Sequence, residues 1–488
     1  MSSKDSSRAA AEKPRGFADR LGDAASAEER LVAAVGRVYE AWGFERLETP
    51  AIEFTDSLGK FLPDLDRPNE GVFSFKDDER WLSLRYDLTA PLARYAAEER
   101  QNLPRPFRRW QAGPVWRNEK PGPGRFREFW QCDADTVGAE DPAADAEMVA
   151  MACEAFEAIG LPREAFALKV NSRRLLNGLL QRSGLAGEGV EAKRLIVMRT
   201  IDKLDRVGVD GVAALLGKGR KDESGDFTKG AELDPKAIDT VLAFVTIASA
   251  SRGGVLEALG RVVGDTVEGR AGIAELTRID AVLSALGVDE ARAQFDPSIV
   301  RGLEYYTGAV FEAQLMAVGG GGALGSIGGG GRYDDLIARF TGERVPATGF
   351  SIGVSRLVAA QAQLGLAEQA VAPAPVVVLA LDGDRIGDYF AMANELRAAG
   401  VRAETYLGSS GMKAQLKYAD KRNAPVAVIQ GGDELAKGVV TLKDLKLGAK
   451  IAAGLGEDRE AYAKARERVQ QEAPRAQLVA AVQQMLAP

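Results

Sequence analysis

The segment RNEKPGPGRFREFWQCDAD, residues 117–135, consists of two extended runs joined by a Pro-Gly turn. It predicts a hairpin in which residues 111–119 and 125–135 are strands and KPGPG is the connection. Alternate residues of a strand share a face, so one face of this hairpin is polar and the other can pack. The polar face carries Arg117, Glu119, Arg125, Arg127, Gln131, Asp133 and Asp135, and the packing face carries Trp116, Phe126, Trp130 and Cys132.

Two interpretations of this polar face remain open from the spacing alone. One is a solvated hairpin with cross-strand ion pairs, which stabilise a fold little. The other is a floor that binds an anion and a cation together.

Two further stretches repeat this ambiguity. RWLSLRYDLTAP, residues 80–91, alternates as a strand would, with Asp87 and Thr89 on its polar face, and is also typical of an ordinary amphipathic strand. RGLEYYTG, residues 301–308, sets Arg301 before a glycine and a pair of tyrosines, and is also typical of an aromatic core strand.

Glycine-rich sequence follows this second stretch. GGGGRYDDL, residues 328–336, could let the backbone approach a ligand closely, although a glycine run alone is a weak indication. GVSRL, residues 353–357, places Arg356 near a predicted helix start, which is a favourable position for a phosphate.

Composition limits the class of protein. A chain of 488 residues predicts two or three domains, and a net charge of -7 argues against a uniformly basic surface without excluding a local basic stripe. The only cysteines, Cys132 and Cys153, are too few for a disulfide scaffold. We expect no membrane span, since no apolar run is long enough.

The chain contains no histidine. The usual acid/base group at neutral pH and the commonest metal ligand are therefore both missing. We expect chemistry based on carboxylates, arginines, tyrosines, backbone groups or bound ions, and we assign no metal-ligating residue.

The order of predicted elements divides the chain after its first 14 residues, which we expect to be disordered. Residues 191–289 are mainly helical and predict an inserted subdomain, with a mobile loop at 217–230. An Ala/Pro-rich linker at 366–375 precedes alternating strands and helices, which predict a small domain with a largely parallel sheet. A charged tail at 456–488 is expected to be helical.

The predicted helix at 412–424 in this last domain carries a basic stripe. Lys413, Lys417 and Lys421 recur at every fourth residue, so they share one helix face. Such a stripe suits a nucleic-acid backbone, and it is also typical of a solvated helix face.

Taken in order, RYDLTAP, WRNE with GRFREFWQCDAD, RGLEYYTG, GGGGRYDDL and GFSIGVSRL resemble the histidyl-tRNA synthetase family of class II aminoacyl-tRNA synthetases. The resemblance implies an α+β catalytic domain, an antiparallel six- or seven-stranded sheet wrapped by helices, formed by residues 15–190 and 290–365. It also implies that 191–289 is a helical insertion and that 376–455 is a C-terminal α/β anticodon-binding domain.

The same resemblance implies substrates and residue roles. The substrates would be ATP with Mg²⁺, L-histidine and tRNA(His), handled by a cytoplasmic homodimer that has no membrane attachment. The residues that would bind histidine are Asp87, Thr89, Gln131, Asp135, Tyr305 and Tyr306. Arg117 and Arg301 would be catalytic, flanking the carboxylate and α-phosphate. ATP would be bound by Arg117, Glu119, Arg125 and Arg356, and tRNA would be contacted by Lys413, Lys417 and Lys421.

Family members often carry histidine where Asn118 and Trp130 stand here, and some carry glutamate at Asp87 and Asp135. Two alternatives remain: a non-catalytic paralogue that regulates histidine biosynthesis, and a class II synthetase of another specificity. The missing histidines also suggest that the chain can still be translated when histidine runs short.

Overall fold

The computed structural model describes residues 9–61, 71–122, 126–221, 225–302, 305–316, 323–364, 374–448 and 469–487. It separates into two compact units, Met1–Ala370 and Val371–Pro488. None of the helices in these ranges is long and apolar enough to cross a membrane.

The first unit is built on an eight-stranded sheet in the order β1-β5-β6-β13-β12-β11-β7-β10. Its six inner strands pair antiparallel, whereas the edge strands β1 and β10 pair parallel with their neighbours. The antiparallel sheet is therefore confirmed, with a parallel strand added at each edge. The strands are β1 (Glu45–Arg46), β5 (Phe107–Trp116), β6 (Glu128–Val137), β7 (Phe166–Ser172), β10 (Ala293–Phe295), β11 (Ala309–Met316), β12 (Ala323–Arg332) and β13 (Ala347–Gly353).

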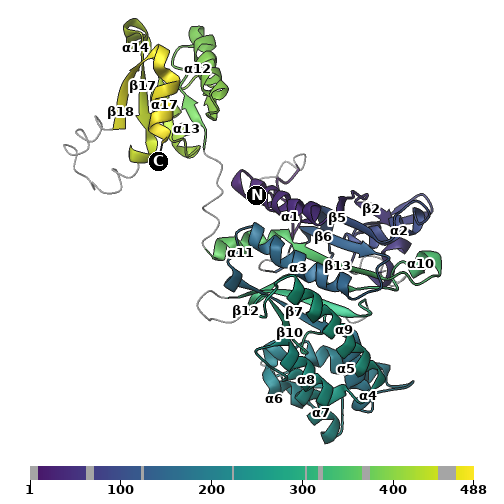
Figure 1. The fold of residues 1–488 in the computed structure, drawn as a ribbon. Helices are drawn as coiled ribbons and strands as arrows, with labels where there is room; N and C mark the ends of the chain where they lie inside the picture. The colour runs from purple at the N-terminus through teal and green to yellow at the C-terminus, as the bar shows by residue number, and fades with distance from the viewer. Residues whose placement is uncertain are drawn as a thin grey trace, which may run out of the picture. The chain divides into compact units, whose positions relative to one another are not determined.

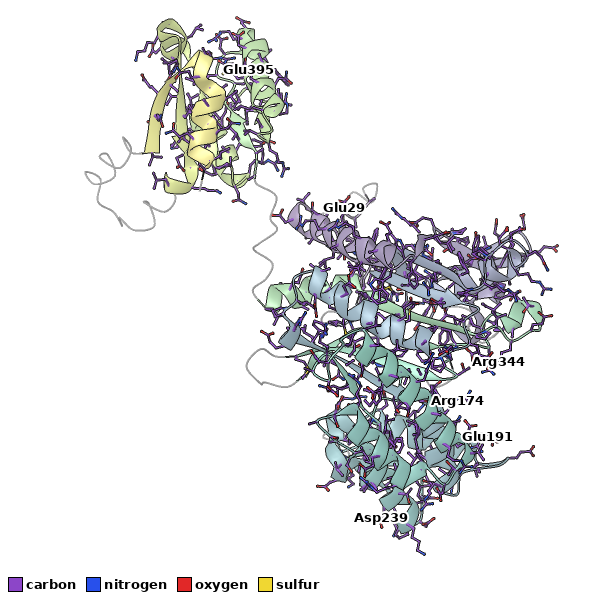
Figure 2. All side chains as sticks on the ribbon, in the orientation of Figure 1. Glu29, Arg174, Glu191, Asp239, Arg344 and Glu395 are labelled. Atoms are coloured by element: carbon purple, nitrogen blue, oxygen red, sulfur yellow. The ribbon has the colours of Figure 1, made fainter. Side chains whose placement is uncertain are left out.

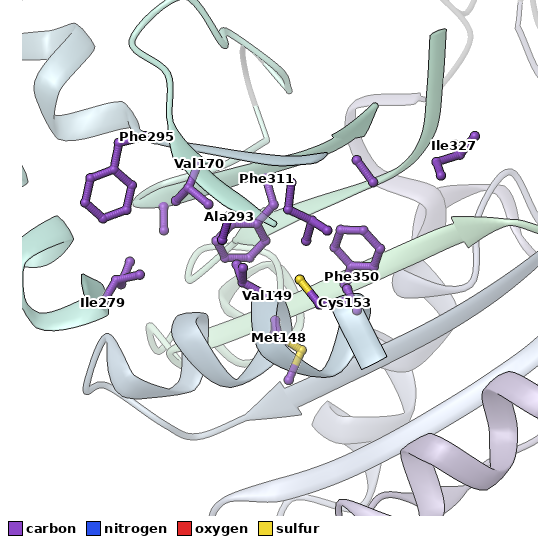
Figure 3. Close-up of a cluster of buried hydrophobic side chains, with 14 of the residues drawn as sticks. Met148, Val149, Cys153, Val170, Ile279, Ala293, Phe295, Phe311, Ile327 and Phe350 are labelled. Carbon is purple, nitrogen blue, oxygen red and sulfur yellow. The ribbon is translucent and has the colours of Figure 1, made fainter. Parts of the chain in front are cut away.

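One face of this sheet is covered by helices. Cys132 and Ala134 of β6 and Phe350 of β13 point into a core shared with α1 (Asp23–Ala41) and α3 (Ala143–Ala158). Figure 3 shows Met148, Val149 and Cys153 of α3 beneath aromatic side chains of the strands. Because strand side chains alternate, the residues between these core positions face the opposite side of the sheet.

The helical insertion packs at one end of the first unit, where Figure 1 shows it as a separate group of helices. Its longest helix, α9, contacts α3 and α4, so the insertion is joined to the sheet through helices. Its helices are α5 (Glu191–Ile201), α6 (Leu204–Leu216), α7 (Pro235–Val245), α8 (Arg252–Val263) and α9 (Val267–Ala285), next to α4 (Arg173–Arg182). Glu191 and Asp239 project from this group in Figure 2.

The prediction of a mobile loop at 217–230 is wrong in part. Strands β8 (Gly219–Lys221) and β9 (Phe227–Lys229) form a short antiparallel hairpin there. Phe227 and Thr228 have high strand propensity, which the charge of the segment obscured in the sequence.

The second unit contains a five-stranded sheet, β15-β14-β16-β17-β18. The first three strands are parallel and the last two are antiparallel, so the sheet is mixed rather than largely parallel. The strands are β14 (Val376–Val378), β15 (Ala403–Thr405), β16 (Val426–Ile429), β17 (Val439–Asp444) and β18 (Gln470–Pro474), and the helices are α12 (Ile386–Ala398), α13 (Met412–Lys421), α14 (Gly432–Lys437) and α17 (Leu478–Leu486).

The tail is also not helical throughout the part that the structure describes. β18 pairs with the outer edge of β17, and it is followed by a short 3-10 helix, η5 (Arg475–Gln477), and by α17. Pairing with an otherwise open strand edge outweighs the helix propensity of Gln and Glu residues.

Candidate active site

A cavity of about 560 Å³ lies on the face of the first sheet opposite the helix-covered core. Its floor includes β12, where glycines at 328–330 present backbone instead of side chains. Nine residues with predicted site roles line it: Asp87, Thr89, Arg117, Glu119, Gln131, Arg301, Tyr305, Tyr306 and Arg356. Segments far apart in the sequence therefore converge on one site, and the polar face of the 117–135 hairpin is not simply solvated.

Strand register explains how this floor is organised. Asp133 pairs with Ser351 of β13, Ser351 pairs with Gly329 of β12, and Gly329 pairs with Glu312 of β11. Register partners share a face, so these four residues form one row across the sheet. Since Gly329 has no side chain, the row is open in its middle and a trough runs between β6 and β11.

Asp87 does not lie on a strand, contrary to the alternation of residues 80–91. Strand β4 (Arg80–Leu84), in the small sheet β2-β4-β3 with β2 (Ile52–Phe54) and β3 (Ser74–Asp77), ends early, and helix α2 (Thr89–Glu98) begins after it. The Asp87 carboxylate accepts hydrogen bonds from the backbone N–H groups of Thr89 and Ala90, at 3.1 and 2.9 Å. A side-chain acceptor at a helix start satisfies donors that have no helical partner, so helix capping wins over strand alternation here.

Arg117 stands at the nucleotide end of the predicted site. Its guanidinium carbon lies 4.3 Å from the centre of the Tyr86 ring and 5.0 Å from that of Phe129. The Tyr86 hydroxyl donates to Glu119 at 3.1 Å. Aromatic contacts on this guanidinium restrict its motion and leave its charge directed into the cavity.

Arg301 is held by an acidic partner that the sequence did not reveal. Its guanidinium forms an ion pair with Glu312 of β11, whose side chain is 8% exposed, while that of Arg301 is 46% exposed. The next residue, Gly302, has φ of 60°. An added Cβ there would lie 2.2 Å from a ring carbon of Tyr306, so only glycine permits this approach.

The two tyrosines after Arg301 enter the cavity together. Their ring centres lie 5.1 Å apart in an edge-to-face arrangement, and the Tyr305 ring also lies 5.7 Å from that of Tyr333. Burial raises the pKa of both hydroxyls well above the ordinary value for tyrosine. Both tyrosines are therefore neutral at physiological pH.

Asp135 is the predicted histidine-binding residue that the structure does not bring to the cavity lining. It lies deeper, forming an ion pair with Arg109 at 2.8 Å and accepting a hydrogen bond from Tyr333. Gly349 on β13 leaves room for this carboxylate, since a Cβ there would lie 1.9 Å from Asp135 Oδ1. The pattern placed Asp135 on the polar face, but only cross-strand register reveals that Arg109 is its direct neighbour.

Asp133 lines the cavity, although the sequence pattern suggested no role for it. It is 1% exposed, and burial together with the nearby Asp135 raises its pKa to about 8, while Arg109 and Ser351 act in the opposite direction. Alternation along the strand correctly placed the Asp133 side chain on the polar face of the hairpin. A role for it could have been inferred because it is a third acid on that face, beside Glu119 and Asp135.

The remaining predicted contacts are partly covered. Gln131 donates to the Ser351 hydroxyl, and Arg356, in the first turn of α11 (Val354–Gln363), donates to the Ser326 carbonyl at 2.9 Å. Arg125 lies outside the described residues. In the second unit, Lys413, Lys417 and Lys421 are all exposed on α13, whereas Gln415 and Ala419 on its other face are buried.

Comparison with known proteins gives the class of this molecule. A family model described as Histidyl-tRNA synthetase matches residues 16–357, and one described as Anticodon binding domain matches residues 376–484. A six-stranded antiparallel core with an arginine-lined cavity, followed by such a domain, defines an aminoacyl-tRNA synthetase.

The similar proteins narrow the class. Histidine--tRNA ligase of Caulobacter vibrioides is 57% identical over 98% of this chain and 97% of that protein, and that of Methylocella silvestris is 54% identical over 98% of both. The crystal structure of histidyl-tRNA synthetase from Nostoc sp. PCC 7120 matches with a TM-score of 0.72 and 29% identity, covering 98% of this chain and all of that one. The chain belongs to the histidyl-tRNA synthetase family.

Proposed function

We propose that this chain activates L-histidine with ATP to histidyl-adenylate and transfers it to the 3′ end of tRNA(His). The observation that carries the proposal is the cavity itself, whose lining contains Arg117, Arg301, Asp87 and Glu119 together with the glycines at 328–330. The near full-length identity to histidine--tRNA ligases supports the same substrates.

The first step requires positioning and charge neutralisation rather than a general base. The substrate carboxylate oxygen attacks the α-phosphorus of ATP, the bond from this phosphorus to the α–β bridging oxygen breaks, and pyrophosphate leaves with that electron pair. A carboxylate is already ionised at neutral pH, so no proton has to be removed. Arginines that are held before the reaction can stabilise the charge that develops on the α-phosphate.

The second step transfers the activated acyl group. A hydroxyl oxygen of the terminal ribose of the tRNA attacks the adenylate carbonyl carbon, the bond from this carbon to the phosphate oxygen breaks, and AMP leaves with that electron pair while the hydroxyl proton passes to a phosphate oxygen of the departing AMP. The described lining residues include no lysine, so the arginines supply the positive charge of the cavity. In the proposal, Arg117 and Arg301 flank the reacting phosphate in both steps.

The residue roles follow from position within the cavity. Asp87, Thr89 and Gln131 would contact the α-amino group, Tyr305 and Tyr306 would enclose the substrate, and Glu119 and Arg356, with Arg125, would contact ATP. Asp135 would act from behind the lining, through Arg109 and Tyr333.

Mg²⁺ fits this site as an ion carried mainly by the nucleotide. Among the described residues no group of three or more acidic or cysteine side chains could hold a metal ion. Mg²⁺ usually takes one or two protein carboxylates together with substrate phosphates. Glu119, in the cavity lining, would supply such a carboxylate, and the ion would neutralise phosphate charge.

The second unit would bind the anticodon end of the tRNA. Its match to an anticodon-binding family and the exposed lysine face of α13 support this assignment. We also expect the chain to act as a homodimer in the cytoplasm, as family resemblance implies.

The test is ATP–pyrophosphate exchange with each of the twenty amino acids in turn, with Mg²⁺ present. Exchange that depends on histidine alone is expected. No exchange with any amino acid would instead favour a regulatory paralogue. A Bacillus halodurans protein described as an ATP phosphoribosyltransferase regulatory subunit/histidyl-tRNA synthetase has a similar fold, with a TM-score of 0.65 and 24% identity over 84% of this chain and 96% of that one.

A further inference from the structure

A hydroxyl group at the nucleotide end of the proposed site joins three elements of the first unit. Ser355 lies in the first turn of α11 and lines the cavity. Its Oγ accepts a hydrogen bond from the backbone N–H of Trp130 at 3.1 Å and donates one to Glu28 Oε1 at 2.5 Å. A hydroxyl has a single proton, so these two bonds fix its direction and tie α1, β6 and α11 together.

The elements that this hydroxyl joins carry two arginines of the cavity lining. Trp130 follows Phe129 on β6, and the Phe129 ring centre lies 5.0 Å from the guanidinium carbon of Arg117. Ser355 directly precedes Arg356 on α11. A shift of α11 against β6 would therefore change how Arg117 and Arg356 are placed relative to each other.

Glu28 occupies a position where the helix pattern calls for an apolar side chain. Leu31, Val35 and Val38 follow it at helical spacing along α1, and all four residues are buried. A buried carboxylate is costly unless it is paired, and replacing a buried ion pair by apolar residues is often neutral or stabilising. Stability alone therefore does not account for an acid here, whereas its bond to a residue of the cavity lining does.

Arg20 makes this acid compatible with a nearby nucleotide. Its guanidinium forms an ion pair with Glu28 Oε2, so the two carboxylate oxygens have separate partners. The N-terminus of α11 carries a partial positive charge, which suits a phosphate, and an uncompensated carboxylate beside it would oppose that attraction. The ion pair keeps the oxygen that orients Ser355 and offsets its charge.

We infer that Glu28 is a positioning residue for ATP: through the Ser355 hydroxyl it holds the first turn of α11 against β6. This inference rests on the proposed function, because it concerns the nucleotide that the enzyme would use. Arginines that are fixed before the nucleotide arrives lose less freedom on binding its phosphates, so the affinity for ATP is higher. Glu28 is outside the cavity lining and acts through Ser355.

The experiment compares Glu28→Ala with Glu29→Ala, the same change at the next residue of α1, which is exposed and is labelled in Figure 2. ATP–pyrophosphate exchange gives the KM for ATP and for L-histidine, and calorimetry gives the dissociation constant for ATP. E28A should raise both ATP constants on the order of 10-fold, as expected for one hydrogen bond to a charged group, and leave the KM for histidine within about twofold of wild type. E29A should leave all three values at the wild-type level.

Two further variants test the route through the hydroxyl. Ser355→Ala should weaken ATP binding as E28A does, and the double variant should bind ATP no more weakly than either single variant. Glu28→Gln keeps an oxygen that can accept from Ser355 and removes the charge that Arg20 offsets. E28Q should therefore bind ATP within about threefold of wild type, which a loss of packing around residue 28 would not predict.

The outcomes separate this inference from the proposed function. Normal ATP binding by a folded E28A, equal rises of the KM for ATP and for histidine, or independent effects of E28A and S355A would each overturn the inference. If E28A does not fold, S355A decides alone: weaker ATP binding with an unchanged KM for histidine supports the inference, and unchanged ATP binding overturns it. A wild-type chain that shows no exchange with histidine would refute the proposed function, while the calorimetric ATP affinities would still decide the role of Glu28; a wild-type chain that binds no ATP would refute both.

Discussion

Replacing Arg301 should separate its catalytic role from its structural one. In Arg301→Ala a fixed donor beside the α-phosphate is lost, and one such donor contributes on the order of 10²–10³-fold to a rate, or about 2.7–4 kcal/mol. The same change leaves Glu312 unpaired with 8% of its side chain exposed. A buried acceptor without a partner costs about 1–3 kcal/mol of folding stability, so R301A should also melt earlier than the wild type.

Glu312→Gln is the matched variant. It keeps a hydrogen-bond acceptor for Arg301 but removes the charge that fixes the guanidinium. An arginine side chain carries about 2 kcal/mol of rotamer entropy, so complete loss of its anchoring would cost at most about 30-fold in rate. We expect E312Q to lie between that limit and the wild type.

The double variant provides the decisive comparison. If Glu312 acts only by holding Arg301, E312Q should cost nothing further in rate once Arg301 is alanine, and it should restore part of the lost stability. Single-turnover adenylate formation and thermal unfolding are measured on all four proteins. A rate for R301A within threefold of wild type, or an E312Q effect of equal size in both backgrounds, would refute this account.

Three other predictions concern different parts of the molecule. Burial and the nearby Asp145 raise the pKa of Glu275 on α9 to about 7, so the folded state holds a proton that the unfolded state releases above about pH 4.3. The free energy of unfolding should therefore fall as pH rises from about 5 to 7. Urea titrations of Glu275→Gln should show a weaker fall with pH, and an equal fall in both proteins would contradict the prediction. Replacing Lys413, Lys417 and Lys421 together by alanine should weaken tRNA binding and reduce its dependence on salt while pyrophosphate exchange stays normal; an unchanged salt slope would show that this helix face is merely solvated. Gly349→Ala should lower the melting temperature, because its Cβ would lie 1.9 Å from Asp135 Oδ1, whereas Gly260→Ala in α8, with nothing within 4 Å, should not; equal effects would remove the steric argument.

The sequence predicted the site best where alternation continues along a real strand. The parity of β6 correctly set Gln131 and Asp133 on one face and Cys132 on the other, since β6 is regular from Glu128 to Val137. The same reasoning gave a strand through Asp87, where the structure has a helix start. Asp87 fits both strand alternation and the acceptor position at a helix start. Only the hydrogen bonds that it accepts from the Thr89 and Ala90 backbone show that the second is correct.

Partners across the sheet could not be predicted. Glu312 forms an ion pair with Arg301, and Arg109 forms one with Asp135. In each case the two partners are brought together by how the chain enters the sheet or by strand register, and not by the alternation of residues within one strand. A one-residue shift of register moves every side chain to the opposite face, and no short motif specifies that register. The six-stranded antiparallel core, in contrast, followed from the resemblance, and its parallel edge strands β1 and β10 are too short to give a clear alternation.

The bare stretch of β12 also limits how such a site can change. At Gly329, which belongs to the row across the trough, a Cβ would lie 3.2 Å from the Phe311 carbonyl oxygen, closer than an ordinary van der Waals contact, so a side chain added there would have to displace neighbouring backbone. New substrate preferences can therefore arise mainly on the flanking strands, where side chains already project into the trough. Because the floor of this binding site has no side chains to exchange, both natural variation and engineering of its specificity are expected at residues of β6 and β11, which flank the floor.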